Sequence, residues 1–421
     1  MRHVPSSIKP TEPERVAATM LHWHSLELVS YRKIQTLWAG YGYIYELTAR
    51  ATSDEVAAEV RRAFHAGEEM ESFPLILKFI APPPTHDLED EGHLRKLMSY
   101  GVEQYFYKFI VPQLEDDTPV AHCIATTLDS RGKPGAELLE GLTATIMTDL
   151  RPRYPIEGEK SELSDRQVHA ALAWLSNFHK TTRKLIPDDL DKFLHPPLEE
   201  ARRRQTGDNS GTKLWLNGGY TYLATRRKEF ASLAGDEYSE WSTLCVPPSI
   251  AEMAATFLTP RGRDYETLIH GDVKSENLFT TKSGNKVAFY DFQYVGLGLG
   301  VCDLAKLFTC SVPLDLLVDD KSNIPDVLSM ERGEKKLLEY YYSKLLNGFK
   351  DTNGRSLKYD WDEFVRHWEV ALVDWLRFQA SWGFWGNTQW LESRVRSILR
   401  DQNWREWLEK NQGSRLNEAP A

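Results

Sequence analysis

The sequence contains few cysteines and no long run of apolar residues. Its four cysteines form no CxxC pair and no regular spacing, which argues against a disulfide framework. No stretch approaches the roughly 20 consecutive apolar residues that a membrane-spanning helix needs. The first residues, MRHVPSSIKPTEPERV, lack the apolar core of a secretory signal. We therefore expect a cytoplasmic protein with reduced thiols and no membrane partner.

The chain also lacks an excess of positive charge. It carries 51 lysines and arginines against 61 aspartates and glutamates, which gives a net charge of −10. Because nucleic acids and anionic membranes attract basic surfaces, this balance argues against both as partners. The run EEARRRQTG, residues 199–207, is interpreted as a solvated helix end. His22 and His24 have no third ligand near them in the sequence, so we expect no metal there.

The chain has enough apolar sequence for a substantial core, and its 421 residues predict two or three structural units. Residues 11–30 show helical spacing, and strands are expected over 33–51, 73–80 and 143–150. Helices are expected over 93–110 and 165–182 and through most of the later sequence. The pattern predicts an α+β fold. Its expected segments are a leading helical segment (1–32), a mostly β unit (33–150), a mostly helical unit (151–410) and a disordered tail (411–421).

The stretch HGDVKSEN, residues 270–277, places Asp272 five positions before Asn277. This is the D-x-x-x-x-N spacing of a kinase catalytic loop, in which the aspartate accepts the hydroxyl proton and the asparagine binds Mg²⁺. A hairpin is expected over 277–293, and Asp291 ends its second strand, where a carboxylate suits Mg²⁺. Either aspartate alone is as well explained by a turn or a strand end. The combination indicates phosphoryl transfer from ATP.

A lysine that contacts the phosphates of ATP is expected on an upstream strand. Lys78 is the only charge in FPLILKFI, and an ammonium among apolar residues is costly unless it is paired. Glu103 is the only carboxylate between His93 and Gln113, so we expect it to pair with Lys78. The alternative is a surface lysine on an edge strand, with its charge reaching into solvent.

Two further segments are candidates for nucleotide binding. Gly40 and Gly42 form a Gly-x-Gly turn, which lets backbone N–H groups approach phosphates and equally serves a plain hairpin. Both interpretations stay open. The segment IMTDL, residues 146–150, is expected to link the two parts of the chain, with backbone groups from Thr148 to Leu150 near adenine. This assignment follows from order along the chain.

Together, HGDVKSEN, YDFQ and DLAKLF resemble the aminoglycoside phosphotransferase and choline kinase-like superfamily. The segments SYGVEQYFYKFIVPQL and DFQYVGLGLGVCDLA look closest to its ecdysteroid-kinase-like branch. The resemblance covers residues from about 33 to 390 and is strongest over 268–308. It implies a bilobal protein-kinase-like fold with a small nucleotide-binding N-lobe, a larger helical C-lobe and a small-molecule hydroxyl as acceptor.

The resemblance also implies roles for single residues. Asp272 would be the base, and Asn277 with Asp291 would bind Mg²⁺. Lys78 and Glu103 would hold the phosphates of ATP. His270 and Asp303 would support the catalytic loop.

The loop departs from this family in one respect, because DVKSEN also resembles the D-L-K-P-E-N loop of protein kinases. Lys274 would then contact the transferred phosphate, and a protein kinase becomes an alternative. Only the eleven residues FQYVGLGLGVC separate Asp291 from Asp303. They leave no room for an activation segment, contain no Ser or Thr, and precede no A-P-E motif. This spacing argues against a protein kinase.

The acceptor is not defined by the sequence. Residues 374–390 are rich in tryptophan, and Trp382 and Trp385 would hold a quaternary ammonium by cation–π attraction if they faced the site. The helical spacing of Trp375, Phe378 and Trp382 is equally typical of core packing. Amino alcohols such as choline, sugars, sterol-like alcohols and antibiotics all remain candidates. A binding protein that kept the fold without catalysis is the alternative from another class. The oligomeric state stays open.

Overall fold

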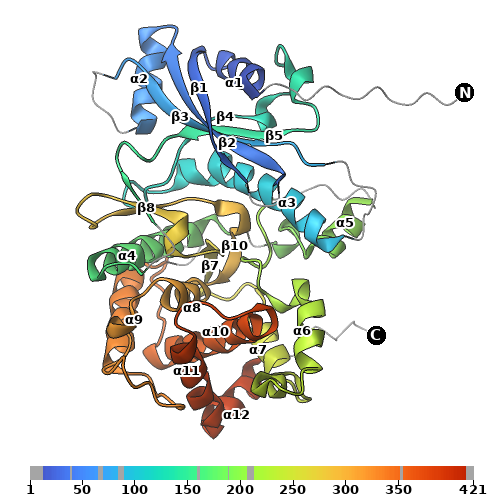
Figure 1. Cartoon of the computed structure of the whole chain (residues 1–421), viewed down its shortest axis with the longest axis vertical. Helices are drawn as coiled ribbons and strands as arrows, with labels where there is room; N and C mark the ends of the chain where they lie inside the picture. Colours follow the sequence, from blue (N-terminus) through green and yellow to red (C-terminus); the bar gives the residue numbers. More distant parts are fainter. Residues whose placement is uncertain are drawn as a thin grey trace, which may run out of the picture. The chain divides into compact units, whose positions relative to one another are not determined.

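Alternating apolar residues build an antiparallel sheet of five strands in the first part of the chain (Figure 1). The order in the sheet is β1-β2-β3-β5-β4, so β3 is an inner strand. Leu47, Leu75 and Ile146 are buried on one side of it together with Met20 of the first helix. The strands are β1 (Leu26–Thr36), β2 (Gly42–Ala51), β3 (Phe73–Ile80), β4 (Cys123–Thr126) and β5 (Thr143–Thr148).

The computed structural model describes residues 13–37, 40–64, 70–83, 90–158, 162–187, 189–205, 213–350 and 354–413. From residue 414 onward, the tail that was predicted to be disordered lies outside the described residues. The chain divides into two units. The first comprises residues 1–88, 104–112 and 121–150, and the second comprises residues 89–103, 113–120 and 151–421.

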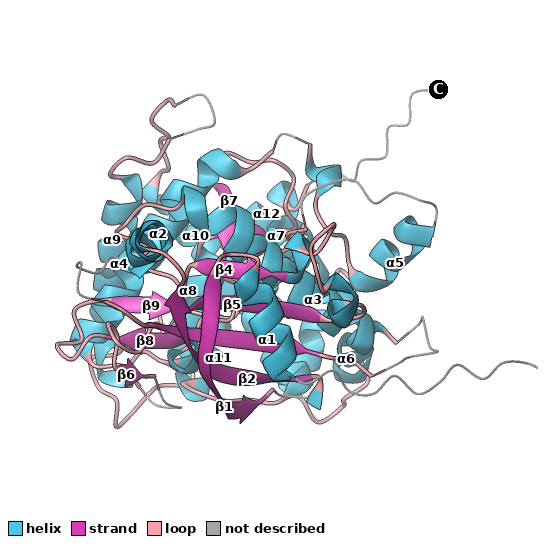
Figure 2. Ribbon diagram, turned by 90° about the horizontal axis from the view of Figure 1, so that it is seen from above, coloured by secondary structure: helices cyan, strands magenta, loops and turns pink. Residues whose placement is uncertain are grey.

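The leading helix predicted over residues 11–30 is shorter in the structure. α1 (Pro13–His22) ends in a tight turn in which Ser25 has a φ of 55°. Leu26 then begins β1, because it pairs with β2. The alternation of Leu26 and Leu28 is the period-two signal of a strand, and pairing with β2 overrides the helical spacing. Figure 2 shows α1 lying along β1, which it contacts.

Of the other helices of this region, one was not predicted and one was. α2 (Asp54–Phe64) occupies the charged segment between β2 and β3. The helix predicted over 93–110 is present as α3 (Glu91–Tyr105), which continues as one π-helical turn (Phe106–Ile110).

The second unit is mostly helical, and two small sheets interrupt its helices. β7 (Glu266–Ile269) pairs with β10 (Gly296–Leu299), and β8 (Leu278–Thr280) lies between β6 (Ile156–Glu157) and β9 (Val287–Phe289). Its helices are α4 (Asp165–Thr182), α5 (Pro197–Gln205), α6 (Arg227–Ala234), α7 (Ile250–Leu258), α8 (Val301–Cys310), α9 (Arg332–Leu346), α10 (Trp361–Trp382), α11 (Thr388–Arg400) and α12 (Gln402–Asn411).

The helix α10 is central to the second unit, since it packs against α6, α7, α8 and α11. The strand predicted over 73–80 and the helix predicted over 165–182 match β3 and α4. The capping box of Ser164 and Gln167 fixes the start of α4. The α+β fold is therefore confirmed, with a β-sheet in the amino-terminal part and a mostly helical remainder.

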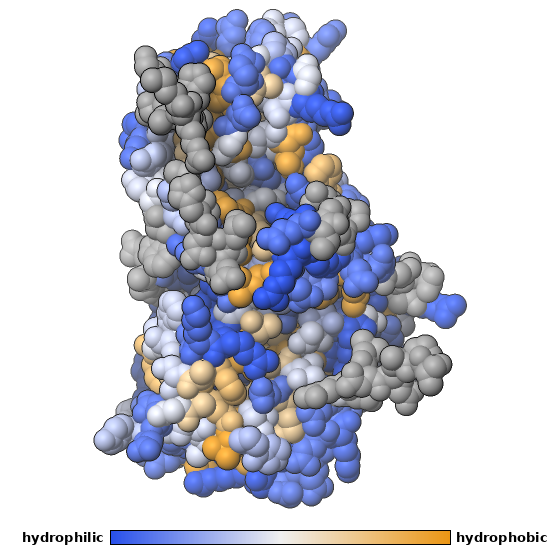
Figure 3. Space-filling view, turned by 90° about the vertical axis from the view of Figure 1, so that its right-hand side faces the viewer, coloured by the Kyte–Doolittle hydropathy of each residue, from blue (hydrophilic) through white to orange (hydrophobic). Residues whose placement is uncertain are grey.

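Some large apolar side chains of the described residues are exposed. On the face shown in Figure 3, hydrophobic residues form small groups separated by hydrophilic ones. Val29 and Ile34 of β1 are exposed at the two positions where the pairing of β1 with β2 shifts register. Such bulges hinder an edge strand from pairing with another sheet. No described helix is long and apolar enough to cross a membrane.

Glu369 makes the stability of the second unit depend on pH. Burial in α10 raises the pKa of its carboxyl to about 7, and the guanidinium groups of Arg394 and Arg366 offset this only in part. The folded state therefore holds this proton between about pH 4.5 and pH 7, where the unfolded chain releases it. As pH rises through this window, Glu369 lowers the free energy of unfolding by up to about 3 kcal/mol.

We expect Glu369→Gln to remove this contribution. Chemical denaturation at pH 5 and pH 8 measures it: the stability of the variant relative to wild type should rise with pH by about 2 to 3 kcal/mol. Glu339→Gln is the control, because the Glu339 side chain is 52% exposed and its replacement should change stability by less than about 0.5 kcal/mol. A pH-independent difference for Glu369→Gln would contradict the assignment.

Candidate active site

The predicted catalytic loop follows β7 directly, in the second unit. β7 ends at Ile269, and the loop continues from His270 into a 3₁₀ turn (Ser275–Asn277) before β8. Gly271 has a φ of +84°, and a Cβ there would lie 2.6 Å from the backbone nitrogen of Gly219. Only glycine fits both the conformation and the space. The loop is therefore packed closely against the segment around Gly219.

Asp303 holds the start of the loop from the first turn of α8. The side chain is fully buried; its Oδ2 accepts from the His270 N–H at 2.7 Å and its Oδ1 from the Gly271 N–H at 2.9 Å. Oδ2 also lies 3.2 Å from Nε2 of His179. Burial alone would raise the pKa of Asp303, but the hydrogen bond from His179 and the charge of Lys306 outweigh it and lower the pKa. The structure thus places Asp303 where a residue supporting the loop belongs.

Lys306 was not expected at the site from the sequence. It lies three residues after Asp303, is buried, and donates from Nζ to the Gly271 carbonyl at 2.6 Å. The signal that could have revealed it is a lysine within the apolar helix VCDLAKLF, since a buried ammonium needs an acceptor. Asp303 and Lys306 therefore fix the N–H and the C=O of the same glycine.

His270 connects the loop to the strand that ends near Asp291. Its Nδ1 accepts from the Asp272 N–H at 3.2 Å, so Nε2 carries the proton and donates to the Tyr290 carbonyl at 2.9 Å. Burial lowers the pKa of His270, which favours this neutral form. His270 is a structural link between the two segments that carry the predicted catalytic residues.

Asp272, Lys274 and Asn277 are close together. Nδ2 of Asn277 donates to the backbone carbonyl of Asp272 at 2.8 Å and to its Oδ2 at 2.9 Å. Nζ of Lys274 lies 3.3 Å from the same Oδ2. Burial alone would lower the pKa of Lys274, but the carboxylates of Asp272 and Glu276 outweigh it and raise the pKa. A charged ammonium and an oriented carboxylate therefore meet at one point of the loop.

Asp291 has an uncommon backbone conformation. Its φ of 65° and ψ of 57° are left-handed, which is rare for a residue other than glycine and marks functional positions. Its Oδ1 accepts from Nε2 of Gln293 at 2.7 Å, and Oε1 of Gln293 accepts from Ser99 at 3.2 Å. Gln293 was not singled out in the sequence, although it belongs to the YDFQ motif. It orients the carboxylate of Asp291.

The residues fit a hard divalent cation. The backbone N–H of Tyr290 donates to the carbonyl of Asn277 at 3.0 Å, which brings Asn277 and Asp291 to the same end of the hairpin. Nδ2 of Asn277 points to Asp272, so its side-chain oxygen can serve as a ligand. Mg²⁺ is typically bound by one or two such oxygen groups together with phosphates and water. No cluster of three His, Cys, Asp or Glu side chains occurs among the described residues.

The remaining nucleotide-binding candidates lie mostly in the first unit. Lys78 is 8% exposed and pairs with Ile44 of β2 and Thr145 of β5, so it lies on an inner strand. This position contradicts the alternative of an edge-strand lysine. Glu103 is buried as well, but it belongs to the second unit. The pairing of Lys78 with Glu103 stays a prediction.

Gly40 and Gly42 have structural requirements of their own. Gly40 has a φ of +70°, and a Cβ on Gly42 would overlap the backbone oxygen of Phe79 on β3. Hairpin geometry thus explains both glycines, and a role with phosphate stays a prediction. Thr148 ends β5, where its hydroxyl accepts from the His122 N–H at 2.9 Å. Leu150 closes the first unit, and the contact of this segment with adenine also stays a prediction.

The tryptophans of the late sequence divide into two kinds. Trp375 and Trp390 are buried, as core packing predicts. Trp382 is 57% exposed, so core packing does not explain it. Trp385 is half-buried and donates from its indole N–H to Sγ of Cys310 at 3.2 Å.

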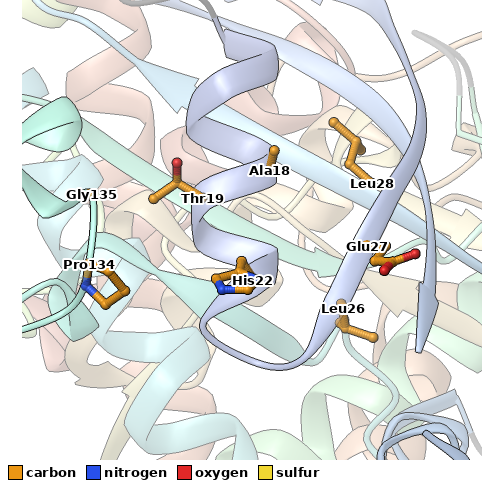
Figure 4. A pocket seen from close by; sticks show the side chains of 8 residues that line it. All are labelled: Ala18, Thr19, His22, Leu26, Glu27, Leu28, Pro134 and Gly135. Carbon is orange, nitrogen blue, oxygen red and sulfur yellow. The ribbon is translucent and has the colours of Figure 1, made fainter. Parts of the chain in front are cut away.

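A surface pocket of about 580 Å³ lies elsewhere, in the first unit. It is bounded by α1, β1 and the turn at Pro134 and Gly135 (Figure 4). The side chains of Thr19, His22 and Glu27 line it. None of the described residues that were predicted for the site contributes to this pocket, so it is separate from the catalytic loop.

The sequence matches a known family over most of its length. A model of the ecdysteroid kinase-like family matches residues 56–353. No curated protein is significantly similar to the chain in sequence.

Solved structures that resemble it include a macrolide 2′-phosphotransferase from Brachybacterium faecium, at 11% identity and a TM-score of 0.43, covering 94% of this chain and 98% of that one. An ethanolamine kinase from Plasmodium vivax shares 12% identity at a TM-score of 0.38, with coverage of 95% and 93%. A choline kinase from Cryptosporidium parvum shares 11% sequence identity at a TM-score of 0.39, and the match covers 95% of this chain and 96% of that one.

We expect Asp303→Asn to destabilise the second unit by about 3 kcal/mol. An amide has one acceptor oxygen, so one loop N–H would face an NH₂ group instead. Urea denaturation followed by tryptophan fluorescence measures the loss. Asp315→Asn, at a carboxylate that is 58% exposed, should stay within about 0.5 kcal/mol of wild type. Equal stability of the two variants would contradict the role of Asp303.

Proposed function

The chain belongs to the ecdysteroid kinase-like family, and we propose that it transfers the γ-phosphoryl group of ATP to a hydroxyl group of a small molecule, with Mg²⁺. The observation that carries this proposal is the arrangement of Asp272, Lys274 and Asn277, which meet at Oδ2 of Asp272. In phosphoryl transfer, a carboxylate orients the acceptor and cationic groups neutralise the developing charge. These groups are present on one loop.

In the proposed reaction, Asp272 accepts the proton of the acceptor hydroxyl as the new P–O bond forms. The bond between the γ-phosphorus and the β–γ bridging oxygen breaks, and its electron pair leaves with ADP. Asn277 and Asp291 would hold Mg²⁺, which supplies charge neutralisation on the phosphates. Lys274 adds positive charge beside the base. Catalysis would come mainly from positioning and electrostatic stabilisation.

The segment after Asp291 supports a small acceptor over a protein acceptor. It forms a 3₁₀ turn (Phe292–Tyr294) and then β10. Every residue of β10 is buried, and β10 pairs with β7, the strand that precedes the loop. α8 begins at Val301 directly afterwards. A protein kinase presents its substrate on a longer activation segment, for which this connection leaves no room.

We expect Asp272→Asn to lower turnover by a factor of at least about 100, because the amide cannot accept the proton. A screen of ADP release against a library of alcohols supplies the acceptor, and the variant is then compared with wild type on it. Nucleotide binding should survive. Asp319→Asn, at a carboxylate that is 63% exposed, is the control and should keep wild-type turnover. Full activity of the Asp272 variant would rule out this mechanism.

We expect Asp291→Ala to abolish stabilisation of the protein by ATP in the presence of Mg²⁺. At a ligand concentration of 100 Kd, the wild type should gain about 2.7 kcal/mol, seen as a rise in melting temperature. Removing Mg²⁺ with a chelator should abolish the rise in wild type and change nothing in the variant. A wild type without any shift would contradict nucleotide binding. A shift without ADP release on any alcohol would favour the binding protein without catalysis.

A further inference from the structure

Next to the catalytic loop lies a cluster of aromatic rings in the second unit. Gly219 packs against Gly271 of the loop, and Tyr220 follows it directly. The ring of Tyr220 lies 4.9 Å from that of Tyr294 and 5.8 Å from that of Phe378, and Phe378 stacks on Trp382 at 6.0 Å. Burial raises the pKa of Tyr220, and the nearby negative charge of Asp272 raises it further. Aromatic rings thus lie beside the loop that carries the proposed base.

A cation of the chain itself already occupies this cluster. The guanidinium carbon of Arg226 lies 4.9 Å from the ring centre of Trp382, 5.5 Å from Phe378 and 5.7 Å from Tyr220. Three rings therefore surround one buried charge, which is the geometry that recognises a quaternary ammonium in other proteins.

The position of Arg226 is fixed by its own contacts. Nε donates to the Tyr220 carbonyl at 2.8 Å, and Nη1 donates to Oε1 of Glu229 at 3.1 Å. Arg226 is 5% exposed, so these hydrogen bonds are largely shielded from water. The guanidinium is held as part of the scaffold and does not lie loosely on the surface.

We propose that Arg226 determines the specificity of the acceptor site by excluding alcohols that carry a positive charge. It takes the aromatic faces that would attract an ammonium group, and it pairs with the Glu229 carboxylate that could also attract one. This inference rests on the proposed function, since it assigns the acceptor class of the same site: neutral or anionic alcohols are admitted, and choline-like amino alcohols are rejected.

The test compares two alcohols of the same shape, choline and its neutral carbon analogue 3,3-dimethyl-1-butanol. Their binding in the absence of ATP is measured by titration calorimetry, so the result does not depend on catalysis. Wild type should bind the neutral alcohol more tightly. Arg226→Gln should shift the ratio of the two dissociation constants toward choline by about tenfold, because the vacated aromatic faces become available.

Two variants serve as controls, one that keeps the positive charge of residue 226 and one that removes an exposed arginine beside it. Arg226→Lys keeps a cation at the cluster and should keep the preference of wild type. Arg227→Gln removes a neighbouring arginine that is 58% exposed and should also leave the ratio unchanged. If Arg226→Gln fails to fold, the other two proteins still test the inference. Tighter binding of choline than of the neutral alcohol by wild type or by Arg226→Lys would contradict it.

The inference is overturned if wild type binds choline at least as tightly as the neutral alcohol, if Arg226→Gln folds without a shift, or if no protein binds either alcohol. ADP release with both alcohols is measured in parallel. A shift in binding, in a protein that releases no ADP with any alcohol of the library, would refute the proposed transfer reaction and leave the role of Arg226 intact.

Discussion

The buried carboxylate of Asp303 is the contact on which the site depends. It binds two consecutive backbone N–H groups at the point where β7 becomes the catalytic loop. A carboxylate with no exposed surface is stabilised there by the hydrogen bond from His179 and by the positive charge of Lys306. The loop conformation is therefore set by charge balance inside the second unit, and the direction in which Asp272 points follows from it.

This contact joins elements that are distant in the sequence. Nδ1 of His179, on α4, lies 2.7 Å from the hydroxyl of Tyr341 on α9, and its Nε2 lies 3.2 Å from Asp303 on α8. A chain of hydrogen bonds thus runs from α9 through α4 and α8 to the loop. Helices with a packed core hold the groups that we propose to react, and such positioning would contribute to catalysis.

The sequence allowed the parts with a local signal to be predicted. The apolar runs of β3 and α4 and the spacing of Asp272, Asn277 and Asp291 were readable, because each depends on a short stretch with its own period or motif. The start of β1 could not be predicted in this way, because it depends on the pairing of Leu26 with Ala51 of β2, which lies far along the chain. His179 was missed for the same reason, because its partners Tyr341 and Asp303 lie on other segments. Lys306 and Gln293 stand in the readable stretches VCDLAKLF and YDFQ, but their contacts with the Gly271 carbonyl and with Ser99 depend on the fold.

The role of the aromatic cluster could not be predicted either, because it depends on a contact between distant segments. The tryptophans of residues 374–390 were visible in the sequence and allowed either a core or an ammonium site. The deciding residue is Arg226, which lies about 150 positions earlier than Trp382 and has no motif of its own. Cation–π attraction acts on a ligand and on a side chain alike. The aromatic cluster therefore indicates that a cation is bound, but it does not show whether the cation belongs to a ligand or to the protein. In our proposal, the acceptor specificity of this site therefore follows from the side chain of Arg226, which the fold places against the aromatic cluster.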